Sequence, residues 1–280
     1  MASTNPMLSE QYFRTTARTA PSTIDAQARQ AAFGTTGVGY PPITTEKTMT
    51  MGGVVSATGA LLVCILVGAG FGWNRVTITT VRNELEQSFS TVHFPVGLLI
   101  GSVLVAFVFA MIARFKPPMA QFLGIPYALV EGFALGMISH AYDIQSKGIA
   151  VQAVLATFGV FAVMLVLYSM RILRATPKFV KGVIAATGGI MLMYVFALIF
   201  SAFGTRLSFL SSTSPLSIGI SVVIVAVAAF NLIIDFDFIE RGSAAGLPKH
   251  MEWFAALGLV ITIVWLYLEM LRLLSKLQRR

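Results

Sequence analysis

The sequence predicts an all-α membrane protein, a seven-transmembrane-helix bundle in which the last helix is central. Hydrophobic residues make up 56% of the 280 residues, charged residues only 11%, and the mean hydropathy is +0.80. Soluble domains are typically about a quarter charged. The apolar residues are concentrated in blocks of about 20–25, enough to cross a hydrocarbon core of roughly 30 Å. No alternating barrel pattern is present, so each block is expected to be helical and to satisfy its own backbone groups.

Seven apolar blocks follow one another along the chain. We expect transmembrane helices over residues 51–73, 94–114, 119–142, 148–170, 179–203, 215–240 and 251–277. The longest connection, residues 74–93, is expected to hold a short amphipathic or extended piece. The first 47 residues are rich in Ala, Thr, Ser and Gln and lack the apolar core of a secretion signal. We therefore predict a disordered N-terminal tail, residues 1–47, and a seven-helix transmembrane domain, residues 48–280.

The basic residues lie mainly in the connections, where they act as topology signals, so the net charge of +8 does not indicate nucleic-acid binding. Of the 20 Lys and Arg residues, 12 lie on the side of the N-terminus and eight on the other. The positive-inside rule places the N-terminus in the cytoplasm, and seven crossings then leave the basic C-terminus outside. If one block were re-entrant, both termini would be inside. We expect the plasma membrane, specifically the inner membrane of a bacterium.

Small residues recur at the spacing that lets membrane helices approach closely. Gly68 and Gly72 are four residues apart, as are Gly132 and Gly136. Each pair lies on one helix face and predicts a close helix–helix contact.

Several chemistries are disfavoured by composition. The single cysteine, Cys64, excludes an intramolecular disulfide and a Cys-rich metal site, and the three histidines lie far apart along the chain. No nucleophile–base–acid arrangement accompanies the membrane-embedded acids. We therefore expect no enzyme activity and no cofactor; ion or proton handling is the natural class.

Most of the 12 acids lie in connections or the tail. The exceptions are Glu131, Asp235, Asp237 and Glu269. Each ionised carboxylate at mid-membrane costs about 2.5–3.5 kcal/mol on the insertion scale. Such residues persist where they face a cavity, pair with a base or remain protonated.

Asp235 and Asp237 separate on helical geometry. Asp235 lies about five residues before the end of its helix, roughly 7–8 Å inward, on the same face as Asn231. Asp237 faces nearly the opposite way and precedes Arg241 by four residues, the spacing of a local ion pair. Arg114, at the end of its own helix on the same side of the membrane, either reaches inward to Asp235 or anchors its helix at the headgroups.

The other two acids lie on different helices. Glu131, near mid-membrane, has no helix-local base and is predicted to be protonated or to line a polar cavity. Glu269 precedes Arg272 by three residues, so it either pairs locally or contributes to the same site as Asp235.

Three segments resemble the Bax inhibitor-1 family, and its bacterial branch in particular. They are "EGFALG" in the third helix, "IIDFDFI" at the end of the sixth and "WFAALGLVITIVWLYLEMLRLL" as the last helix. In the family's pattern, the sixth helix carries an Asp with a Gln two positions later and an Ile four positions later; Asp235 and Ile239 match, and Asp237 replaces the Gln. The last helix usually carries a second Asp, and here Thr262 stands in its place, ten residues before Arg272.

The resemblance implies a pH sensor in which two aspartates share a proton and an Arg of the second helix latches one of them. It makes Asp235 the sensor and Arg114 the latch. The family's gating is associated with a pH-dependent calcium leak. Thr262 puts the pH response and the calcium selectivity in question, and Glu269, two turns further along the same face, is an alternative second acid.

Our first hypothesis is a pH-gated calcium or cation leak. Calcium prefers oxygen ligands, with Asp235 foremost. The candidate donors are Asp235, Glu131, Thr262, Asn231 and Asp237. Protons are the alternative transported ion. The alternative function is a non-transporting regulator that binds a membrane protease or another membrane protein.

Overall fold

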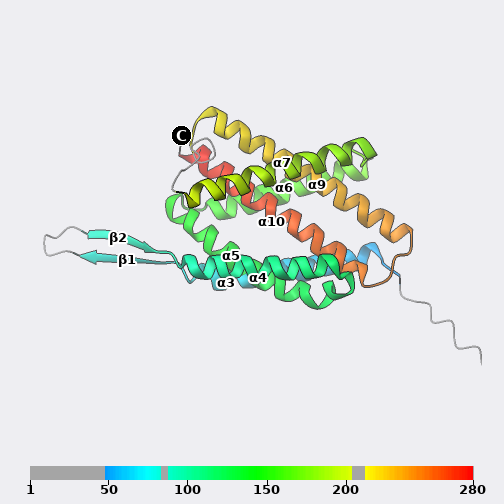
Figure 1. Cartoon of the computed structure of the whole chain (residues 1–280), viewed down its shortest axis with the longest axis horizontal. Coiled ribbons are helices and arrows are strands. Elements are labelled where there is room, and N and C mark those ends of the chain that lie inside the picture. The colour runs from blue at the N-terminus through cyan, green and yellow to red at the C-terminus, as the bar shows by residue number, and fades with distance from the viewer. Residues whose placement is uncertain (1–47, 83–87, 204–211, 280) are drawn as a thin grey trace, which may run out of the picture. The chain divides into compact units, whose positions relative to one another are not determined.

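The computed structural model describes residues 48–82, 88–203 and 212–279. Seven helices in these ranges are long and apolar enough to cross a membrane, which confirms the predicted fold class. They are α3 (Met51–Trp73), α4 (Val96–Phe115), α5 (Ala120–Gln145), α6 (Ile149–Ser169), α7 (Pro177–Ala202), α9 (Pro215–Ala244) and α10 (Met251–Gln278), with a short 3₁₀ turn η2 (Pro117–Met119) before α5 (Figure 1). The predicted tail, residues 1–47, lies outside the described residues.

The connection between α3 and α4 forms a two-stranded antiparallel hairpin (Figure 1). Strand β1 (Thr77–Arg82) pairs with β2 (Ser88–His93), with Thr77 opposite His93 and Arg82 opposite Ser88. The β-branched run "TITTV" favours extended backbone. Of the two alternatives for residues 74–93, the extended piece is the one observed.

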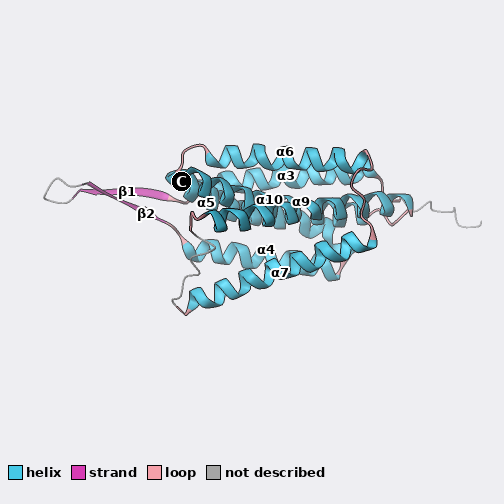
Figure 2. Ribbon diagram, turned by 90° about the horizontal axis from the view of Figure 1, so that it is seen from above, coloured by secondary structure: helices cyan, strands magenta, loops and turns pink. Residues whose placement is uncertain are grey.

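Helix α10 occupies the centre of the bundle. It contacts α3, α4, α5, α6 and α9, and Figures 1 and 2 show it running between the other helices. In its most apolar stretch 67% of the residues are buried, against 6% for α7. The predicted central position of the last helix is therefore confirmed, and α7 is the least enclosed helix.

Helices α3 and α5 approach each other until their backbones touch. A Cβ atom on Gly68 would lie 2.2 Å from the Leu129 carbonyl oxygen, and one on Gly132 would lie 2.2 Å from that of Ile65. Gly72 and Gly136 meet Phe133 and Ala69 in the same way. The close contact predicted from the two glycine pairs is confirmed, because any larger residue would force the helices apart.

The start of α3 is fastened to the turn between α9 and α10. The Met49 backbone N–H donates to the Leu247 carbonyl at 2.7 Å. Glu252 is only 3% exposed; its carboxylate accepts hydrogen bonds from the backbone and the hydroxyl of Thr50 and pairs with Lys249, each at 2.8 Å. Glu252 is not among the acids expected inside the membrane, and no local spacing indicates its partner Thr50, which is 202 residues away along the chain.

The glycine contact yields a matched pair of variants. We expect Gly68→Ala to lower the thermal midpoint of the purified protein, since the new methyl group meets a backbone carbonyl that cannot move aside; overpacking of this kind costs about 1–3 kcal/mol. Gly70→Ala, two residues along the same helix, meets no atom within 4 Å and should leave the midpoint unchanged or raised. Equal midpoints for the two variants, measured in detergent, would contradict the backbone contact.

Candidate functional site

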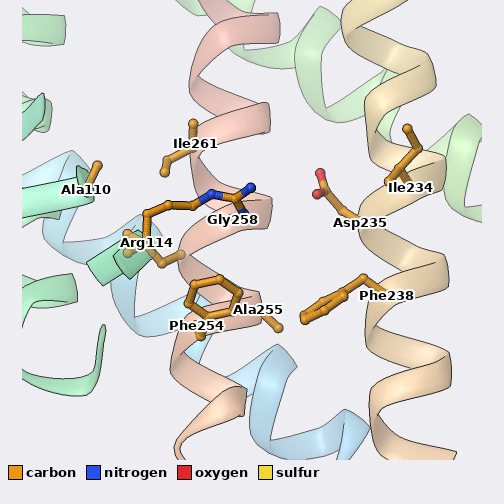
Figure 3. Close-up of a pocket in the computed structure, with 10 residues that line it drawn as sticks. Ala110, Arg114, Ile234, Asp235, Phe238, Phe254, Ala255, Gly258 and Ile261 are labelled. Atoms are coloured by element: carbon orange, nitrogen blue, oxygen red, sulfur yellow. The ribbon is translucent and has the colours of Figure 1, made fainter. Parts of the chain in front are cut away.

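The family-type site residues gather around a pocket of about 300 Å³ between α4, α9 and α10. Arg114 enters it from α4 and Asp235 from α9, and Figure 3 shows their side chains directed toward one another. The rest of the wall is apolar or small, and is made by Ala110, Ile234, Phe238, Phe254, Ala255, Leu257, Gly258 and Ile261. The structure therefore brings the predicted sensor and latch into one cavity. No ion pair joins these two described residues.

Space for an Arg114 side chain comes from the small residues of α10. A Cβ on Gly258 would meet no atom within 4 Å, so the glycine leaves open space on the helix surface that faces the pocket. Thr262 follows one turn later on the same side of α10. Its hydroxyl lies beside the Asp235 carboxylate and donates a long hydrogen bond, 3.3 Å, to the Gly258 carbonyl oxygen.

The two aspartates of α9 have different surroundings, as helical geometry predicts. Asp237 pairs with Arg241 across one helical turn, with 2.8 Å between Oδ2 and Nε, which confirms the expected local ion pair. The Oδ2 atom of Asp235 is buried without a hydrogen-bond partner among the described residues. A buried polar atom of this kind costs about 1–3 kcal/mol, and more when it carries a charge. Asp235 therefore has unused capacity to bind a proton or a cation.

Asn231 and Glu131 lie outside the walls of this pocket. Asn231 points toward α7, where its amide donates to the Thr187 hydroxyl at 2.9 Å. Glu131 has no hydrogen bond or ion pair to another described residue; its neighbour Gly132 packs against α3. Their predicted roles in ion binding stay predictions, but neither residue joins Asp235 in a single ligand set.

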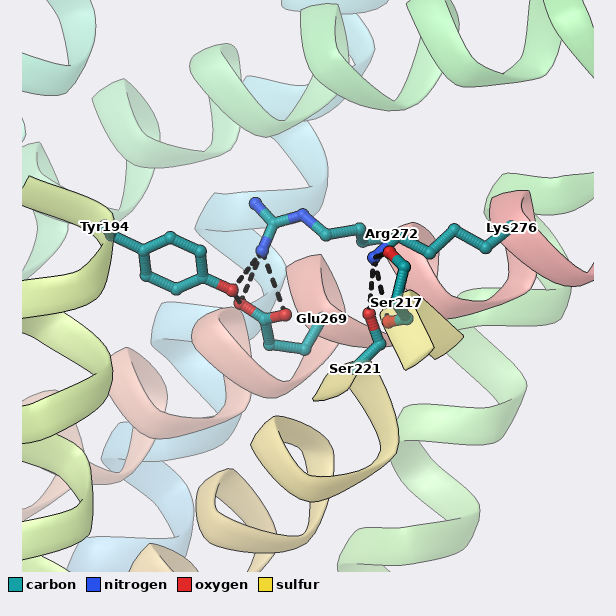
Figure 4. A network of polar contacts seen from close by, with 6 residues as sticks. All are labelled: Tyr194, Ser217, Ser221, Glu269, Arg272 and Lys276. Atoms are coloured by element: carbon teal, nitrogen blue, oxygen red, sulfur yellow. Dashed lines mark hydrogen bonds and ion pairs between the residues drawn. The ribbon is translucent and has the colours of Figure 1, made fainter. Parts of the chain in front are cut away.

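Glu269 belongs to a separate network toward the other end of α10 (Figure 4). Its carboxylate is 2% exposed and accepts from the Arg272 guanidinium at 2.9 Å and from the Tyr194 hydroxyl of α7 at 2.8 Å. The Arg272 guanidinium also contacts the Tyr194 hydroxyl and lies 4.9 Å from the centre of its ring. Glu269 is thus paired locally and does not reach the Asp235 pocket. Nothing in the spacing of the sequence indicates Tyr194, because it comes from another helix.

Lys276 lies one turn beyond Arg272 on α10 and forms a second group of polar contacts (Figure 4). It is buried, and its ammonium donates to the hydroxyls of Ser217 and Ser221 of α9, each at 2.8 Å, and to the Ser217 carbonyl at 3.2 Å. From the sequence, Lys276 is expected only to contribute to the basic charge of the C-terminus. Ser217 and Ser221 are four residues apart on one face, a pattern that indicates a polar stripe but names no partner.

Tight metal binding has little support in the described part of the chain, where no three His, Cys, Asp or Glu residues cluster. The side-chain oxygen atoms that line the pocket are those of Asp235; Thr262 lies beside Asp235 but does not line the pocket, and its hydroxyl is bonded to the Gly258 carbonyl. Calcium takes about 6–8 oxygen ligands. A cation at this place would retain much of its water, which suits passage better than storage.

Comparison with known proteins identifies the family. A family model described as Bax inhibitor 1 like matches residues 5–279, nearly the whole chain. The resemblance drawn from the helix motifs is therefore confirmed, while the bacterial branch stays a prediction. A search among curated proteins finds no match.

The Glu269 network predicts unequal costs for its two partners. Arg272→Gln leaves a buried carboxylate with one neutral donor, so we expect a loss of about 3 kcal/mol or more in the free energy of unfolding. Tyr194→Phe keeps the ion pair and removes the hydrogen bonds of the hydroxyl to Glu269 and Arg272, which should cost about 1–2 kcal/mol. Denaturant titration of both variants in detergent tests this order; a larger loss for Tyr194→Phe would contradict the ion pair as the main contact.

Proposed function

The chain belongs to the Bax inhibitor 1 like family, and we propose that it forms a pH-sensitive leak pathway for calcium or another cation. One observation carries the proposal: the Asp235 carboxylate and the Arg114 guanidinium face one pocket, where no described residue hydrogen-bonds to a buried oxygen of Asp235. The two groups come from different helices, α4 and α9. Pairing or releasing them therefore changes how these helices are held.

The proposed switch has two states. With Asp235 ionised, Coulomb attraction across a low-dielectric pocket favours a closed arrangement in which Arg114 pairs with the carboxylate. A proton on Asp235 removes the negative charge, so Arg114 loses its partner and the open arrangement gains population. Flux should therefore rise as pH falls. Flux rises with acid, and not with base, because the closed state is the one that contains the ion pair.

The route of the ion would follow the polar face of α10. Beyond the pocket, Thr262 offers a hydroxyl on the same face of the helix, and Glu269 follows two turns later. In the structure the Arg272 guanidinium occupies the Glu269 carboxylate. This second ion pair would act as a barrier at the far end of the route, so conduction requires both pairs to open.

One observation favours the alternative, a non-transporting regulator that binds a membrane protease or another membrane protein. The position of the family's second Asp holds Thr262, whose hydroxyl carries no charge and donates within its own helix. A site with a single acid lacks the shared proton. Under this alternative Asp235 is a structural polar residue of the bundle.

Calcium flux into vesicles containing the purified protein tests the leak directly. We expect wild-type flux to increase several-fold on acidification and Asp235→Asn to lose most of this pH response, because the amide cannot gain a charge. Asp237→Asn is the matched control, since Asp237 lies two residues away on the same helix and outside the pocket. Wild-type flux no greater than that of protein-free vesicles would contradict the leak and favour the regulator. Unchanged flux and pH response in Asp235→Asn would contradict the switch at Asp235.

Thr262→Asp would restore the missing acid. Two neighbouring carboxylates at positions 235 and 262 could not both ionise readily, so they would share a proton and titrate as a pair. We expect calcium flux to change with pH in two separated steps, where the wild type shows one. Thr262→Val, which has a similar shape and no hydroxyl, should keep the single wild-type step. Identical profiles for the Asp and Val variants would show that Thr262 and Asp235 do not act together.

A further inference from the structure

A second pocket, of about 420 Å³, lies where the connection from α6 to α7 meets the last turns of α9. Three arginines line it, Arg171 and Arg174 from the connection and Arg241 from α9, together with two acids of α9, Asp237 and Glu240. It shares Asp237 and Arg241 with an adjoining cavity that Lys181 also lines. The proposed leak pathway makes no use of this basic pocket.

Of the three arginines that line the pocket, two form ion pairs with its two acids. Arg171 pairs with Glu240 at 2.8 Å, and Arg241 pairs with Asp237 at 2.8 Å. Arg174 is exposed and forms no ion pair with a described residue; its Nε donates to the Arg171 carbonyl at 3.3 Å. Most of the Arg174 guanidinium thus remains free to bind an anion.

The chain is folded so that both arginines of the connection reach the pocket. Arg171 has φ 60°, the one positive φ among the described non-glycine residues, and this left-handed conformation turns the chain back after α6. Its backbone N–H donates to the Tyr168 carbonyl at 2.9 Å. The Tyr168 hydroxyl and the Arg171 guanidinium hold opposite oxygens of Glu240. The wall of the pocket is therefore built by specific contacts.

The ends of the neighbouring apolar spans put the pocket where lipid headgroups are expected. The adjoining spans end at Ser169 and begin at Pro177. Between them Met170 and Ile172 are 64% and 60% exposed, and these apolar side chains flank Arg171. Apolar side chains beside arginines suit a lipid interface, where one group meets acyl chains and the other meets phosphate. A soluble anion would gain nothing from Met170 and Ile172.

We propose that this pocket binds the phosphate group of an anionic lipid headgroup. Arg174 supplies the planar pair of N–H donors that matches a phosphate. Thr176 and Pro177 place the start of α7 in the same wall, where the helix dipole favours negative charge. Basic pockets between membrane helices are recognised binding places for such headgroups. The proposal is independent of the leak pathway, because it uses neither Asp235 nor Arg114.

Native mass spectrometry of the full chain, with phosphatidylglycerol and phosphatidylcholine added in turn, tests the proposal. We expect the wild type to retain phosphatidylglycerol preferentially, and Arg174→Gln to bind it about fivefold more weakly, the effect expected for one basic residue at an anionic surface. Lys147→Gln removes an equally exposed charge from the connection between α5 and α6 and should bind as the wild type does.

Two further arms identify the source of the phosphate. Arg174→Lys keeps the charge without the planar donors, so its affinity should fall between wild type and Arg174→Gln. Inorganic phosphate at the lipid's concentration should not displace phosphatidylglycerol; displacement would overturn the assignment to a lipid. Equal retention of phosphatidylglycerol by Arg174→Gln and wild type would overturn the site itself, provided that thermal melting shows both proteins to be folded.

Discussion

Inside hydrocarbon no water is available to accept or donate a hydrogen bond, so every polar side chain of the central helix has to find its partner within the bundle. At the start of α10, Glu252 meets Thr50 and Lys249. Toward its end, Glu269 meets Arg272 and Tyr194. These contacts attach α10 to the segment before α3 and to α7. The demand for partners, as much as apolar packing, accounts for the central place of the last helix.

The pocket beside the first half of α10 departs from this rule. Asp235 of α9 lines it and has a buried oxygen with no hydrogen-bond partner in the described part of the chain, although the Arg114 guanidinium faces the same pocket. A bundle that satisfies Glu252, Glu269 and Lys276 has the means to satisfy one more acid. An arrangement that can exchange a proton against an ion pair is more useful in a switch than in a scaffold. The contrast between these bonded side chains and Asp235 therefore supports the proposed switch at the Asp235 pocket.

The sequence predicted what depends on short spacings within one helix. The seven spans follow from hydropathy, the α3–α5 contact from glycines four residues apart, and the Asp237–Arg241 pair from the same interval. Contacts between residues on different helices could not be predicted from these spacings. Asn231 lies only about 40° around α9 from Asp235, so a small rotation of the helix decides whether it joins the pocket or turns to α7. Tyr194 likewise cannot be predicted as a partner of Glu269 until α7 is placed beside α10.

The contacts that hold each helix indicate which of them can move. Helix α3 is joined to α5 by backbone contact at four glycines, so any movement of one helix against the other has to break a closely packed contact. Helix α7 is barely buried, and among the described residues three side-chain hydrogen bonds join it to other helices: Asn231 to Thr187, Tyr194 to Glu269 and Arg272 to Tyr194. On α7 they involve Thr187 and Tyr194, which lie seven residues apart on one face. Headgroup binding at the start of α7 would therefore act on a helix with few attachments, whereas the closely packed α3 and α5 form a more rigid part of the bundle.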